Sequence, residues 1–91
     1  MLKFISLEES FEIYEATFSV TTIGDTVHNE VYIVSPNIGD IDELMKKCER
    51  ISTFLITALD GGDLIFSEYK LEEIYPRENE DEIVIIFTKE G

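Results

Sequence analysis

The sequence predicts one α+β domain, residues 1–91, in which a long helix packs on one face of an antiparallel sheet of about five strands, in the order β-β-β-α-β-β. Three observations support this: a helical apolar period in mid-chain, a strand-turn-strand pattern before it, and an apolar run near the C-terminus. With 44% apolar residues, the chain can form a hydrophobic core and is too apolar for intrinsic disorder.

The segment 41–59 is predicted to be the helix. Asp40 and Glu43 form a variant of the capping box, and Gly61-Gly62 supply a stop. Apolar side chains recur every three or four residues between these signals: Ile41, Leu44, Met45, Cys48, Ile51, Leu55, Ala58 and Leu59. Phe54 falls away from this apolar stripe, so we expect its ring to be exposed.

A hairpin is predicted before the helix. Its strands, Thr17–Thr22 and Val27–Ser35, are rich in β-branched and aromatic residues. The segment Ile23-Gly24-Asp25-Thr26 between them has the residue types of a turn.

A second hairpin is predicted after the helix, with Leu64–Tyr75 paired to Ile83–Thr88. Pro76 has no N–H for a strand ladder and should end the first of these strands. Because residues 83–87 are apolar on both faces, we expect them to form a central or covered strand.

The first dozen residues leave alternatives open. Leu2–Ile5 is predicted to be an edge strand. The segment Ser6-Leu7-Glu8-Glu9 is a capping box that opens either a short helix through Phe11 or a simple turn. A long strand should then begin near Glu12.

No constellation of residues predicts catalysis, a metal site or a cofactor. His28, the one histidine, lies in a predicted strand with no paired nucleophile, and Cys48 lies on the apolar stripe, away from the basic side chains of the helix. Glu72 and Glu73 are adjacent on a strand, so they should point to opposite faces. The acidic segments 60–63 and 78–82 lack the spacing of a calcium loop.

The predicted compartment is the reducing cytoplasm. A single cysteine excludes an intramolecular disulfide, and we expect neither a signal peptide nor a membrane span, since no apolar stretch is long enough. If a phage encodes the protein, this compartment is the cytoplasm of the host.

Carboxylates greatly outnumber basic groups, with 20 Asp and Glu against 7 Lys and Arg and a formal net charge of −13. The charge is −5 in residues 1–39, −2 in 40–60 and −6 in 61–91, so the excess lies on the predicted sheet and its loops. Two interpretations stay open: a solvated surface, or a fixed field that steers a basic partner into contact. The sequence has no basic stripe for direct nucleic-acid binding.

A short acidic α+β chain with an apolar core and no active-site motif resembles the phage-encoded DNA-mimic inhibitors, which include uracil-glycosylase inhibitors and anti-restriction proteins. It is most similar, in size and acidity, to the anti-restriction nuclease (Arn) family of T-even phages. The resemblance covers overall size, charge and class. It implies a dimer that imitates B-DNA and blocks a restriction enzyme of the host.

The sequence therefore predicts an inhibitor, not an enzyme, that occupies the DNA-binding site of a basic host protein such as a restriction nuclease. It should contact neither nucleic acid nor membrane directly. The alternative is a small protein-interaction module, such as an antitoxin or a phage assembly adaptor, that binds a basic partner through an apolar patch. Phe54 is the predicted homodimer contact, and the predicted partner contacts are Glu8, Glu9, Glu12, Glu15, Glu68, Glu72, Glu73, Glu78, Glu80, Asp81 and Glu82.

Overall fold

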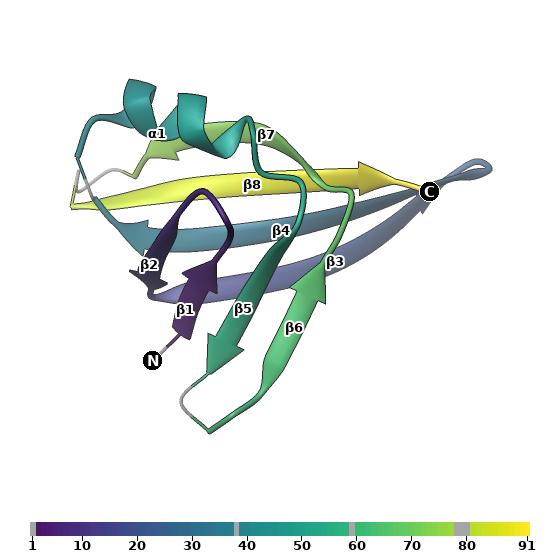
Figure 1. Cartoon of the computed structure of the whole chain (residues 1–91). Helices are drawn as coiled ribbons and strands as arrows, with labels where there is room; N and C mark the ends of the chain where they lie inside the picture. The colour runs from purple at the N-terminus through teal and green to yellow at the C-terminus, as the bar shows by residue number, and fades with distance from the viewer. Residues whose placement is uncertain (1, 38, 59, 78–80) are drawn as a thin grey trace.

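Two four-stranded antiparallel sheets, A and B, contain most of the residues that the computed structural model describes, which are 2–37, 39–58, 60–77 and 81–91. Sheet A has the order β2-β1-β5-β6 and consists of β1 (Leu2–Ile5), β2 (Ser10–Ile13), β5 (Phe54–Ala58) and β6 (Asp63–Phe66). Sheet B has the order β3-β4-β8-β7 and consists of β3 (Glu15–Ile23), β4 (Thr26–Pro36), β8 (Glu82–Glu90) and β7 (Lys70–Pro76). Figure 1 shows the short strands of sheet A crossing the long strands of sheet B. The fold is mixed but dominated by strands, so the prediction of about five strands and one long helix was inexact.

The helix is shorter than predicted. α1 runs from Ile41 to Cys48 and packs near β7. Its N-cap is Asp40, whose Oδ1 accepts a hydrogen bond of 2.9 Å from the Asp42 N–H. The prediction of a helix over 41–59 is wrong in its second half, because the chain turns after α1 and residues 54–58 form β5.

Long-range pairing explains why β5 is a strand. Phe54 and Ile56 are buried on one side of it, with the two-residue period of a strand. The sequence of residues 54–58 alone does not show this, because a short apolar run is compatible with either a strand or a helix. The strand lies between β1 and β6, so its backbone is paired on both sides, which outweighs a local helical preference. The predicted glycine stop belongs instead to the β5–β6 turn, where the Ala58 N–H donates to the Gly62 carbonyl at 2.9 Å. Leu59, the last predicted helical residue, lies outside the described residues.

The N-terminal segment forms a hairpin of β1 and β2 that is closed by a turn. The Ser6 N–H donates to the Glu9 carbonyl at 2.8 Å, and the Ser6 Oγ accepts from the Glu9 N–H at 2.9 Å. Of the two alternatives, the turn is therefore confirmed and the short helix is wrong. β1 pairs with β2 on one side and β5 on the other, so the prediction that it is an edge strand is also wrong.

The hairpin predicted before the helix is confirmed. β3 and β4 pair from Glu15 opposite Val34 to Ile23 opposite Thr26. Gly24 occupies the tip with a φ of 61°, a conformation that favours glycine. In Figure 1 this hairpin extends past the strands of sheet A.

The hairpin predicted after the helix is confirmed only for β7 and β8. The start of the predicted strand 64–75 is β6, which belongs to the other sheet. The chain changes sheets between Phe66 and Lys70, where Glu68 has a φ of 61° and the Tyr69 N–H donates to the Ser52 carbonyl at 3.0 Å. β8 lies between β4 and β7, as its two apolar faces predicted, and β7 ends at Pro76.

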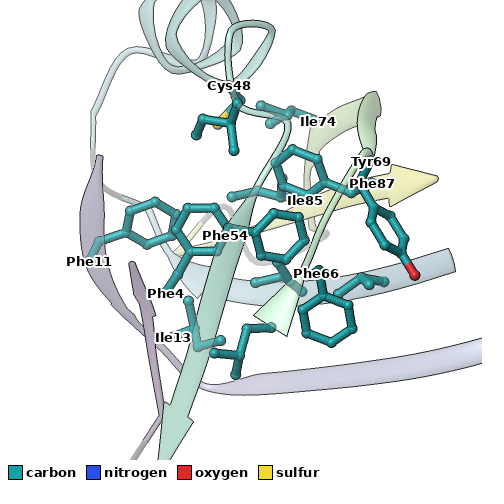
Figure 2. Packing of buried hydrophobic residues seen from close by; sticks show 14 of the residues in the cluster. Phe4, Phe11, Ile13, Cys48, Phe54, Phe66, Tyr69, Ile74, Ile85 and Phe87 are labelled. Atoms are coloured by element: carbon teal, nitrogen blue, oxygen red, sulfur yellow. The ribbon is translucent and has the colours of Figure 1, made fainter. Parts of the chain in front are cut away.

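Aromatic rings fill the space between the two sheets (Figure 2). The centroid of the Phe54 ring lies 4.9 Å from that of Phe4, 5.2 Å from that of Phe66 and 4.6 Å from that of Phe87. Phe54 is 2% exposed, so the prediction of an exposed ring is wrong. Placed in a strand instead of a helix, it points into the core, where it offers no surface to a second copy of the chain.

Replacing Phe54 with alanine should lower the free energy of unfolding by about 3–5 kcal/mol, because it leaves a cavity where the two sheets meet. Phe18→Ala is the matched control, since Phe18 is the same residue type but is 51% exposed. Its expected loss is less than half as large. Urea denaturation followed by far-UV circular dichroism measures both values, and equal losses would contradict this account of the core.

Candidate functional site

Strand pairing determines which side chains share the outer surface of sheet B. Directly paired residues in neighbouring strands point to the same side, and successive residues in a strand point to opposite sides. Val31 and Phe87 are paired, fully buried and part of the core, so they point inward. The residues that alternate with these two along each strand point outward, in five rows: Thr21, His28 and Glu90; Ser19, Glu30, Thr88 and Lys70; Thr17, Tyr32, Ile86 and Glu73; Glu15, Val34, Val84 and Tyr75; Pro36 and Glu82.

An irregularity in β7 places two adjacent carboxylates on this surface. The register shifts between Leu71 and Glu73, which leaves Glu72 as an extra residue in the strand. The Glu72 Oε2 accepts a hydrogen bond of 3.2 Å from the Thr88 Oγ1, and Thr88 points outward. Since Glu73 is paired with the outward Ile86, the prediction that Glu72 and Glu73 point to opposite faces is wrong.

We call this surface the acidic face and define it by its carboxylates, which are Glu15, Glu30, Glu72, Glu73, Glu82 and Glu90. Two basic groups share it. Lys70 is paired with Thr88, and the His28 Nδ1 lies 3.7 Å from the Glu90 Oε1.

The centre of the acidic face is held in place by packing. Val34 and Val84 point outward and yet are buried. On the same surface, Tyr32 of β4 and Tyr75 of β7 are half-buried, and a hydrogen bond between their side chains raises the pKa of Tyr75. The carboxylates therefore project from an ordered sheet with an apolar floor.

The other predicted partner contacts are dispersed. Glu8 is exposed in the β1–β2 turn, Glu12 lies in β2 opposite Lys3, and Glu68 and Asp81 lie next to the ends of strands of sheet B. Glu78 and Glu80 lie outside the described residues.

Two of the predicted contacts are engaged in ion pairs. The Glu9 Oε2 lies 3.5 Å from the Lys47 Nζ, and the Glu82 Oε1 lies 3.5 Å from the Arg77 Nη1. The charges of Glu9 and of Glu82, which lies at one end of the acidic face, are therefore partly offset.

The structure gathers Glu15, Glu72, Glu73 and Glu82 from the predicted set and adds Glu30 and Glu90, which the sequence reasoning missed. Glu30 lies in the middle of β4, opposite Ser19 on one side and Thr88 on the other. The alternation of side chains within the β3–β4 hairpin could have identified Glu30 as outward. That Glu30 lies on the same face as Glu72 and Glu73 depends on β8 pairing with both β4 and β7, which the sequence does not show.

The buried thiol of Cys48 is unsuited to nucleophilic chemistry. Burial, and secondarily the charge of Glu9, raise its pKa to about 12 against the opposing effect of Lys47. The burial predicted for Cys48 is confirmed. The sequence placed Cys48 away from the basic side chains of the helix, yet the charge of Lys47 still lowers the pKa of the thiol to a smaller extent than burial raises it.

Within the described ranges, no group of three or more His, Cys, Asp or Glu side chains is arranged to hold a metal ion. No helix in that part of the chain has the length and apolarity required to cross a membrane. Comparisons with protein-family models, with curated proteins and with solved structures found no match.

The free energy of unfolding should fall as the pH rises above about 9. The folded chain keeps the Cys48 thiol protonated up to a pKa of about 12, whereas the ordinary pKa is 9.0. Between these values unfolding releases a proton, so stability falls by about 1.4 kcal/mol per pH unit; below this range both states hold the proton and the contribution is complete.

Urea titrations between pH 8 and 10.5 measure this slope, with Cys48→Ala as the control. Comparing the two chains separates the thiol from Tyr69 and Tyr75, whose pKa values are also raised in the folded chain. Parallel pH profiles for the two chains would contradict the assignment to Cys48.

Proposed function

We propose that this chain is a non-catalytic inhibitor that occupies the nucleic-acid-binding site of a basic protein in place of DNA. The acidic face supports this proposal, because it groups carboxylates on one side of an ordered sheet with few basic neighbours. The net charge of −13 adds a long-range field that speeds encounter with a basic surface. A DNA-binding enzyme of the cytoplasm, such as a host restriction nuclease, is the proposed kind of target.

The dimensions of the acidic face are compatible with imitation of a short stretch of duplex. β8 has nine residues and spans about 30 Å at roughly 3.3 Å per residue. Phosphates of one DNA strand recur about every 3.4 Å along the helix axis, so this length corresponds to about nine of them. Carboxylates fixed on strands keep their mutual distances, whereas those of a flexible tail do not.

A second candidate function is a protein-interaction module whose partner docks on an apolar surface, as an antitoxin or an assembly adaptor would. The observation in its favour is the exposure of large apolar side chains on two edge strands, β3 and β6. Both functions use a basic protein partner, and they differ in whether DNA competes for it.

Duplex DNA should displace the captured partner if the proposal is correct. Bacterial proteins that bind DNA-cellulose are passed over the immobilised chain and eluted with either a 30-base-pair duplex or a salt gradient. We expect elution by the duplex and a steep dependence on salt, because screening weakens exposed charge contacts. Retention that neither the duplex nor salt affects would contradict the proposal.

Two triple variants test whether the acidic face is responsible. The first replaces Glu30, Glu72 and Glu73 with Gln, and we expect it to weaken capture on the order of tenfold, from three exposed charge contacts of about 0.5 kcal/mol each. The control removes the same charge from the exposed α1 region, by Asp42→Asn, Glu43→Gln and Glu49→Gln. Equal losses would assign the effect to net charge and not to the face.

A further inference from the structure

The edge strand β3 lacks the features that normally protect a sheet edge. It has nine residues, and all but Ala16 are exposed. From Ala16 to Ile23 it contains no charged residue and no proline, and its pairing with β4 is regular throughout. Such an edge offers unpaired N–H and carbonyl groups to another strand.

The opposite edge of the same sheet shows the contrast. β7 carries Lys70, Glu72 and Glu73, is irregular after Leu71, and ends at Pro76. Charges, bulges and prolines of this kind are the usual means by which an edge is kept from pairing. The chain therefore protects one edge of sheet B and leaves the other open.

An apolar depression lies beside the open edge. Phe18 and Val20 belong to the inward side of β3, yet they are 51% and 54% exposed. Across from them, Leu64 on the edge strand β6 is 62% exposed. Phe18, Leu64 and Phe66 line a depression of about 410 Å³, which also includes Lys89. The rings of Phe18 and Phe66 lie next to each other in its lining, with centroids 5.8 Å apart.

We propose that β3 binds an extended segment of a basic protein as an additional strand. Alternate apolar side chains of that segment enter the depression between β3 and β6. The side chains between them lie over the outer surface, beside Glu15 and next to the row that contains Glu30. Because long Lys or Arg side chains there reach these carboxylates, the preferred segment alternates apolar and basic residues.

Charge complementarity selects this occupant over a second copy of the chain. Pairing of β3 with itself would join two acidic faces into one surface and bring together two chains of charge −13. A basic strand lowers that charge instead of doubling it. The inference rests on the proposed function only in that the partner is basic, and it adds the surface and the kind of segment that binds.

Three blocked peptides test this. Ac-KVKVKVKVK-NH₂ presents valines on one side and lysines on the other, and Ac-KSKSKSKSK-NH₂ has the same charge without apolar side chains. The third peptide has the first sequence with N-methyl groups on its fourth and fifth residues, so it keeps every side chain and charge but loses an N–H that strand pairing needs in either direction. We expect the first peptide to bind at least about tenfold more tightly than the other two, a difference of about 1.4 kcal/mol. In amide NMR spectra it should shift the signals of residues 16–23 and 63–66.

Two single substitutions separate the depression from the charge. Val20→Lys places a charge on the depression side of β3 and should weaken binding of the valine peptide more than binding of the serine peptide. Thr21→Lys places the same charge on the outer side and should weaken the valine and serine peptides alike. Far-UV circular dichroism verifies that both variants fold.

Equal affinity for the valine and serine peptides would overturn the inference and leave the acidic face as the binding surface. Light scattering that gives a dimeric mass, with slow exchange of the β3 amides in the free chain, would also overturn it in favour of self-pairing. The proposed function fails separately, when DNA does not displace the partner although the valine peptide still binds β3.

Discussion

Phe54 and Phe4 of sheet A both contact Phe87 of sheet B, and through these ring contacts the two sheets share one core. The strands of sheet A have only four or five residues each, too few for that sheet to be stable by itself. The contacts among Phe4, Phe54 and Phe87 therefore help to determine which face of each sheet points inward. The outward positions, including the carboxylates of the acidic face, follow from that choice.

The separation of charge from core follows from this arrangement. Sheet B places its core residues on one side, so repulsion among Glu30, Glu72 and Glu73 is confined to the solvent side, where salt screens it. The β7 irregularity increases that crowding by turning two adjacent acids to the same surface.

Local chemistry made part of the fold predictable. The β3–β4 turn contains Gly24 at a left-handed position, and Pro76 ends β7, so both signals are readable within a few residues. β5 could not be predicted in the same way, because its strand character depends on pairing with β1, about fifty residues earlier. As a consequence, Phe54 was predicted on the exposed side of a helix, whereas it is buried in the core. The acidic face was likewise predictable for Glu15 but not for Glu90, whose position depends on the order of strands in sheet B.

The acidity of the chain and the open edge of β3 are physically linked. An uncharged strand of high β-propensity at a sheet edge favours pairing between copies, unless something opposes it. Here the opposing force comes from the rest of the molecule, because two copies that each carry −13 repel one another before their edges meet. A basic strand meets no such barrier and is attracted by the same field. The net charge can thus protect the β3 edge against pairing with a second copy of the chain while leaving it open to a basic partner. β3 itself needs no lysine or proline for this protection.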